Sequence, residues 1–141
     1  MKLICPLCKT KFNHIARELV CENNHHFDFA KQGYINLYRS NKPLHGDNNE
    51  MVKARTAFLE KGVYAFLKEY LVNLNTKFHP EVFVDLGCGE GYYTDGFIAQ
   101  EKYGFDLSKD ALKHASKNDK STQYVVLSLI HIWRCRRSTL C

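Results

Sequence analysis

The sequence lacks a long run of apolar residues, and this absence excludes two classes of protein. Its apolar stretches are interrupted within a few positions, so no segment is long enough to cross a membrane as a helix. The first residues, 1–6, contain no apolar stretch of the length that a secretory signal peptide needs. No internal repeat is present. We therefore expect a folded cytoplasmic protein that has no membrane partner.

A strong excess of charge of one sign is also lacking over most of the chain. The formal net charge is +5, but Arg134, Arg136 and Arg137 supply three of these charges, which leaves +2 for residues 1–126. An excess this small does not by itself indicate a nucleic-acid-binding surface.

The first 40 residues contain few aliphatic side chains, and a segment this short rarely folds by apolar burial alone. Cysteine and histidine are concentrated there instead, and in a reducing compartment such a cluster indicates metal binding rather than disulfides. The ligands that we predict are Cys5, Cys8, Cys21 and His25. Two pairs with gaps of two and three residues can close a tetrahedron around zinc. The neighbouring His26 and the intervening His14 are alternatives for the fourth ligand, and four protein ligands indicate a structural site.

After a polar stretch with proline and glycine at residues 41–48, the spacing of apolar residues becomes helical. One helix is predicted from Asn49 to a stop near Gly62, with Met51, Ala54, Arg55, Phe58 and Leu59 on one stripe. A second follows with Tyr64, Leu67, Leu71 and Leu74 on one face. We interpret both stripes as core packing.

Beyond Pro80 short strands alternate with helices. We predict a buried strand at 82–86, a helix at 92–100, a strand at 103–107, a helix at 109–117 that Ser108 caps, and a strand at 123–126. This alternation is the opening of an α/β fold with a parallel, doubly wound sheet, which is incomplete here.

A glycine-rich turn follows the first of these strands, with Gly87, Gly89 and Gly91 alternating along the chain. Glycines at this place let a ligand approach the backbone closely. Tyr92 stands where the dinucleotide fingerprint needs a small residue. Asp106, at the end of the next strand, can accept hydrogen bonds from the hydroxyls of a ribose.

Two neighbours of the turn have alternative interpretations. Asp85 faces the amino end of the ligand or caps the turn. Cys88 is interpreted as a small filler and not as a nucleophile, because no base is evident beside it.

Several motifs follow one another in a characteristic order: Cys5-Pro6-Leu7-Cys8, Cys21 to Asp28, Ala30 to Leu37, Asp47, Met51, Ala54-Arg55, Phe58-Leu59, Gly62, Tyr64, Asp85 to Thr94 and Gly104 to Lys109. Over nearly all of residues 3–126 they resemble the bacterial 23S ribosomal RNA (guanine-N1)-methyltransferases.

The resemblance implies a Rossmann-like class I methyltransferase fold behind a small zinc-binding module. It implies transfer of a methyl group from S-adenosylmethionine to N1 of a guanine in a 23S ribosomal RNA hairpin, and it is compatible with a homodimer. The cofactor-binding residues expected from the turn and from the resemblance are Tyr64, Asp85, Gly87, Gly89, Glu90, Gly91 and Asp106. No catalytic residue is predicted. The zinc module's aromatic residues Phe12, Phe27 and Tyr34 either stack on RNA bases or form the module's core.

We divide the chain into a zinc module (1–40), a linker with helices (41–80), a truncated cofactor-binding α/β domain (81–126) and a tail (127–141). The tail, with Cys135 and Cys141, departs from the family, resembles a translated sequencing adapter, and is predicted to be non-native, which would leave this fragment inactive. The alternatives are a zinc-dependent RNA-binding module without catalysis and a methyltransferase with another substrate. A nicotinamide oxidoreductase is a more distant one.

Overall fold

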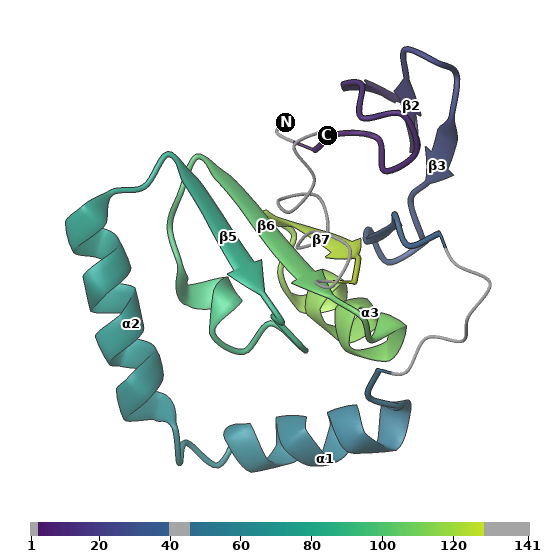
Figure 1. Ribbon diagram of the computed structural model, residues 1–141. Coiled ribbons are helices and arrows are strands. Elements are labelled where there is room, and N and C mark those ends of the chain that lie inside the picture. Colours follow the sequence, from purple (N-terminus) through teal and green to yellow (C-terminus); the bar gives the residue numbers. More distant parts are fainter. Residues whose placement is uncertain (1–2, 40–45, 129–141) are drawn as a thin grey trace.

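The computed structural model describes residues 3–39 and 46–128, which form two sheets and three α-helices (Figure 1). Most of the predicted tail, 129–141, and the first part of the predicted linker lie outside the described residues. Within the described residues, none of the helices is long and apolar enough to cross a membrane.

The first sheet is a small antiparallel one in the order β1-β2-β3. Its strands are β1 (Phe12–Ile15), β2 (Glu18–Cys21) and β3 (His26–Asp28). It carries the cysteine and histidine residues of the predicted zinc module. In Figure 1 its labelled strands β2 and β3 lie apart from α1 and α2, above the second sheet.

The second sheet is parallel, with the order β4-β7-β6-β5. Its strands are β4 (Ile35–Asn36), β5 (Val82–Leu86), β6 (Glu101–Asp106) and β7 (Thr122–Val126). The three strands predicted after Pro80 are therefore present: β5 has the predicted bounds, and the ends of β6 and β7 differ from the prediction by at most two residues. The fourth, β4, comes from within the predicted zinc module, so a boundary at residue 40 does not separate the two sheets.

The two faces of the parallel sheet are covered by different parts of the chain. Side chains of adjacent residues in a strand point to opposite faces. Val125 packs with the small antiparallel sheet, whereas its neighbours Tyr124 and Val126 pack with the helix α3 (Lys109–Asn118). The zinc module therefore covers one face and α3 covers the other.

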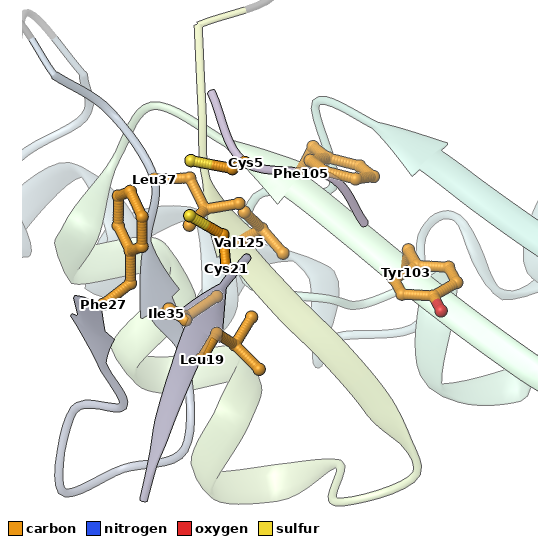
Figure 2. Close-up of a cluster of buried hydrophobic side chains, with 9 residues drawn as sticks. All are labelled: Cys5, Leu19, Cys21, Phe27, Ile35, Leu37, Tyr103, Phe105 and Val125. Atoms are coloured by element: carbon orange, nitrogen blue, oxygen red, sulfur yellow. The ribbon is translucent and has the colours of Figure 1, made fainter. Parts of the chain in front are cut away.

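The core of the zinc module is continuous with the core of the parallel sheet (Figure 2). Its buried members are Cys5, Leu19, Cys21, Phe27, Ile35, Leu37, Tyr103, Phe105 and Val125. The module thus compensates for its few aliphatic residues by sharing apolar surface with β6 and β7.

The strand β5 is an edge strand, and the prediction that it is buried was wrong. Val84 and Leu86 are 48% and 56% exposed, because among the described residues β5 pairs only with β6. Its hydrophobic run resembles that of a central strand, which the sequence pattern alone does not distinguish from an edge.

Two helices precede β5, as predicted: α1 (Asn49–Leu59) and α2 (Ala65–Phe78). Asn48 caps α1 by accepting a hydrogen bond from the Met51 N–H. The stripe of α1 that was predicted to pack in the protein core lies largely on the surface. Met51 and Phe58 are exposed, and only Val52 and Leu59 of this helix are buried. That prediction was wrong because helical spacing shows which residues share one face of a helix, but not whether another part of the protein packs against that face.

The helix predicted over residues 92–100 is replaced by a single 3₁₀ turn, η1 (Thr94–Gly96). The chain becomes extended at Phe97, and the N–H of Ile98 donates to the side-chain oxygen of Asn75 in α2 at 2.7 Å. Glycines at positions 91 and 96 bracket the segment, and glycine is a poor helix former, so this external hydrogen bond prevails.

Candidate functional site

The first half of the candidate metal centre is a tight turn that carries Cys5 and Cys8. The N–H of Lys9 donates to the carbonyl of Cys5, and the N–H of Cys5 donates to the carbonyl of Thr10, both at 2.9 Å. A side-chain hydrogen bond with Thr10, whose oxygen lies 3.1 Å from the sulfur, lowers the pKa of the Cys8 thiol to about 5. This favours the thiolate, which is the form that binds a metal ion.

The second half lies at the end of β2. The N–H of Asn24 donates to the carbonyl of Cys21 at 2.9 Å, and the N–H of His25 points at the Cys21 sulfur at 3.3 Å. Asn24 has a φ of 58°, so the chain reverses there and returns His25 to the sulfur of Cys21.

The two halves bring together four ligand atoms, those of Cys5, Cys8, Cys21 and His25, which all lie within 4.8 Å of one another. The sulfurs of Cys8 and Cys21 are 3.5 Å apart, and Nδ1 of His25 is 3.6 Å from the sulfur of Cys5. Zinc–sulfur bonds of about 2.3 Å in a tetrahedron separate two sulfurs by about 3.8 Å. The donor set and its spacing therefore fit a tetrahedral zinc ion with no open position.

The two alternative histidines lie elsewhere. Nδ1 of His26 is 2.7 Å from a carboxylate oxygen of Glu18, and the ring of His14 packs edge-on against Phe29. The described residues therefore bring only His25 to the three sulfurs.

The aromatic residues of the module contribute to packing. Phe27 is buried in the shared core, Phe12 packs on it edge-to-face with ring centres 5.4 Å apart, and Tyr34 packs against the core beside α3. Their contacts fit the interpretation as core residues better than base stacking.

The glycine-rich turn connects β5 to the rest of the parallel sheet through backbone hydrogen bonds. The carbonyl of Phe105 in β6 accepts the N–H of Gly87 at 2.7 Å and the N–H of Cys88 at 3.1 Å. Gly91 has a φ of +81°, and a Cβ there would lie 2.7 Å from the Tyr124 hydroxyl. Glycine is thus required at position 91 by both conformation and space.

Asp106 stands at the end of β6, beside this turn. One of its carboxylate oxygens accepts the N–H of Gly89 at 2.9 Å, and the other accepts the N–H of Ser108 at 2.8 Å. Each carboxylate oxygen has a second lone pair, so both oxygens keep the capacity to accept a hydroxyl. The side chain is therefore fixed in place and still able to bind a diol.

A cavity of about 460 Å³ opens at this end of the sheet, a volume within the range of small-molecule sites, roughly 300–1,000 Å³. Its lining includes Asp47, Arg55, Tyr64, Gly87, Gly89, Glu90, Tyr92, Tyr93 and Asp106. Five of the seven predicted cofactor-binding residues thus meet at one cavity. Asp85 and Gly91 are not in its lining.

Asp85 has a different partner. Its carboxylate accepts a hydrogen bond from the Thr94 hydroxyl at 2.6 Å, and burial raises the pKa of its carboxyl group. Burial also raises the pKa of the Cys88 thiol, which packs against Gly104. A thiol held neutral is a poor nucleophile, and this agrees with the filler interpretation of Cys88.

Sequence reasoning missed the roles of Arg55 and Asp47 in this cavity. Arg55 forms ion pairs with both Glu90 and Asp47, and Glu90 has a side chain that is only 6% exposed. A signal was present, since Arg55 is a charged residue inside the otherwise apolar stripe of α1.

Comparison with known protein families places the N-terminal part of the chain. Residues 3–42 match the zinc-ribbon family described as RlmA, N-terminal. This match and the four-ligand cluster agree on zinc as the metal of the module.

Two named relatives extend the similarity over most of the chain. The chain is 37% identical over 123 residues to the 23S rRNA (guanine(748)-N(1))-methyltransferase of Streptomyces fradiae, which covers 82% of the chain and 44% of that protein. It is 34% identical over 139 residues to YxjB of Bacillus subtilis (strain 168), a candidate 23S rRNA (guanine-N(1)-)-methyltransferase, covering 86% of the chain and 48% of that protein.

The chain therefore spans about half the length of the relatives that it matches. Residues 3–42 carry the zinc ribbon of the RlmA N-terminal family, and more than four fifths of the chain is similar to part of two proteins named as 23S rRNA (guanine-N1)-methyltransferases.

Proposed function

We propose that this chain supplies the zinc ribbon and the cofactor-binding part of an S-adenosylmethionine-dependent methyltransferase that acts on N1 of a guanine in 23S ribosomal RNA. The observation that carries the proposal is the position of Asp106. Its two oxygens are fixed by the backbone of Gly89 and Ser108 at the mouth of a cavity of small-molecule size. A ribose diol is the natural partner for such a carboxylate.

The charges around the cavity support a cationic cofactor. Asp47, Glu90 and Asp106 place three carboxylates in the lining, against the single guanidinium of Arg55. S-adenosylmethionine carries a sulfonium and an ammonium group against one carboxylate, so its net charge is positive. A nicotinamide dinucleotide would bring two phosphates to the same carboxylates, and like charges at short range are unfavourable.

Bound S-adenosylmethionine would supply an activated methyl group on its sulfonium. The residues of this chain would then hold the cofactor, with Asp106 on the ribose, Gly87 and Gly89 allowing close approach, and Tyr64 beside the cavity. The N1 proton of guanine must also leave during the transfer, and no acceptor for it is assigned among the described residues.

Three further features belong to the same proposal: an RNA hairpin as the substrate, a cytoplasmic location, and assembly as a homodimer. They rest on the resemblance to the family. The alternative of an independent RNA-binding zinc module has weaker support, because the buried residues of the module share one core with β6 and β7.

Cofactor binding by the chain is the first test. Titration calorimetry with S-adenosylmethionine should detect binding, and Asp106→Asn should weaken it because an amide is a poorer acceptor for the diol. Asp110→Asn, in the first turn of α3, makes the same change away from the cavity and serves as the control. Tight binding of NADH, with none of S-adenosylmethionine, would contradict the proposal.

Methyl transfer is the second test. Unmodified 23S ribosomal RNA would be incubated with methyl-labelled S-adenosylmethionine, and reverse transcription would locate the label, because a methyl group on N1 blocks the pairing edge of guanine. The assay compares two proteins: this chain, and the protein encoded by the same locus once a single uninterrupted sequencing read has established the reading frame beyond codon 126. A longer product that binds the cofactor and labels another base, or no RNA, would contradict the proposed substrate.

A further inference from the structure

Arg55 links α1 to the glycine-rich turn through an ion-paired hydrogen-bond network. Its Nε lies 3.0 and 2.7 Å from the two carboxylate oxygens of Glu90, and its Nη2 lies 2.6 Å from one of them. Its Nη1 pairs with the carboxylate of Asp47. The hydrogen bonds with Glu90, together with those to Asp47, raise the pKa of Arg55, so the guanidinium remains charged.

The guanidinium also lies directly against the turn. A Cβ on Gly89 would stand 3.2 Å from Nη2 of Arg55, which is tighter than an ordinary contact. Arg55 therefore forms the wall of the cavity that faces Gly89. The N–H of the same glycine donates to the carboxylate of Asp106.

Little apolar burial holds α1 in this position. Val52 and Leu59 are its only buried residues, while Met51 and Phe58 are exposed. The N-terminal end of α1 is tied down separately, since the Ser108 hydroxyl lies 2.6 Å from the carbonyl oxygen of Asp47. Arg55 is the second point of attachment, about two turns further along the chain.

From this geometry we propose that Arg55 is a positioning residue for the cofactor: it clamps Glu90 and Asp47 and so holds α1 and the glycine-rich turn in binding position. The proposal rests on the proposed function for the identity of the ligand. Glu90 then acts mainly as the buried partner of Arg55, because both of its oxygens accept from the guanidinium.

A lysine at position 55 would keep the charge and lose the clamp. A guanidinium offers a planar fork that binds two carboxylates at once, whereas an ammonium is a single point charge. We expect Arg55→Lys to weaken S-adenosylmethionine binding about tenfold, since directly coupled residues have interaction energies of that order. Arg55→Gln should weaken it further.

Matched variants separate the clamp from a general change in charge. Lys53→Gln removes one positive charge, as Arg55→Gln does, but from an exposed position of α1. We expect it to leave the binding constant for S-adenosylmethionine unchanged. The double variant Arg55→Lys with Glu90→Gln should bind no more weakly than the poorer single variant, because both changes remove one interaction.

Hydrogen exchange of the free protein supplies a readout that does not depend on the cofactor. The N–H of Gly89 donates to Asp106 and that of Gly91 donates to the carbonyl of Cys88. We expect both amides to exchange faster in Arg55→Lys than in the wild type, whereas amides of β1 to β3 should be unaffected.

The outcomes distinguish this proposal from the proposed function. If the wild type does not bind S-adenosylmethionine but the turn exchanges faster in Arg55→Lys, the proposed function fails and the clamp stands. Unchanged exchange together with unchanged binding in Arg55→Lys would overturn the clamp. If Arg55→Lys does not fold, Asp47→Asn replaces it, because this change removes only one of the two ion-pair partners of Arg55. Cofactor binding and hydrogen exchange of the turn, measured on Asp47→Asn, then test the clamp, and we expect smaller changes in both.

Discussion

Phe105 and Gly87 connect the zinc ribbon with the cavity beside the glycine-rich turn. The side chain of Phe105 lies in the core that contains Cys5 and Cys21 (Figure 2). The carbonyl of Phe105 accepts the N–H of Gly87 at 2.7 Å. One residue of β6 thus packs against the metal centre on one side and fixes the start of the glycine-rich turn through its backbone. We therefore expect loss of the metal ion to alter the structure of the cavity.

Removal of zinc should destabilise the parallel sheet as well as the ribbon. A structural zinc ion supplies folding free energy, and here the ribbon's core is shared with β6 and β7. We expect a chelator to lower the melting temperature of the whole chain and to increase hydrogen exchange in both sheets. Readdition of zinc should restore both. Loss of protection confined to β1, β2 and β3 would contradict this coupling.

Truncation of Phe105 tests the same connection without touching the metal ligands. Phe105 is 8% exposed, and Phe→Ala changes in a core cost roughly 3–5 kcal/mol. We expect Phe105→Ala to lower the free energy of unfolding by an amount in that range, measured by urea denaturation, and to weaken zinc retention against a colorimetric chelator. Phe66→Ala, at a 70% exposed position in α2, is the control and should change little.

The parts of the fold that could be predicted from the sequence are those determined by residues close together in the chain. The two metal-binding turns are set by spacings of two and three residues, and the cap at Ser108 by its own hydroxyl, so both were predictable. The helical stripe of α1 did not reveal that Met51 and Phe58 are exposed, because burial depends on what packs against a helix. Nor did the sequence reveal that Ile35 pairs with Val125, 90 positions away.

The candidate site divides in the same way. That Gly87, Gly89 and Asp106 lie together was predictable, because a strand, a turn and the next strand place them side by side in a parallel sheet. The role of Arg55 was missed because its partner Glu90 is 35 positions away, and only the fold brings the two side chains together.

A methyl group at position 91 should be poorly tolerated. The added Cβ would lie 2.7 Å from the Tyr124 hydroxyl and 3.1 Å from Cβ of Ala115, so α3 and β7 would have to move. Overpacking of this kind costs about 1–3 kcal/mol in addition to the strain of a positive φ. Gly87→Ala is the matched control, because its φ is also positive but nothing lies within 4 Å. Gly91→Ala should unfold at a distinctly lower urea concentration than Gly87→Ala.

Asp119 should make stability depend on acid pH. Burial alone would raise its pKa, but hydrogen bonds from Ser121 and Thr122, with the charge of Lys102, lower the pKa to about 2. The unfolded carboxyl group has a pKa near 3.9. Because the folded value is lower, Asp119 stabilises the fold fully above about pH 4 and loses this effect as the pH falls towards 2.

The variant Asp119→Asn isolates this contribution. At pH 7 it should be less stable than the wild type, since Lys102 would lose its charged partner while only 6% of its side chain is exposed. The difference in unfolding free energy between the two proteins should shrink as the pH is lowered from 4 to about 2, because the wild-type carboxylate is then protonated as well. Asp110→Asn, at the first turn of α3, is a control without this partner set. A difference for Asp119→Asn that stays constant from pH 7 down to about pH 2 would show that the charge of Asp119 is not what stabilises this corner of the fold.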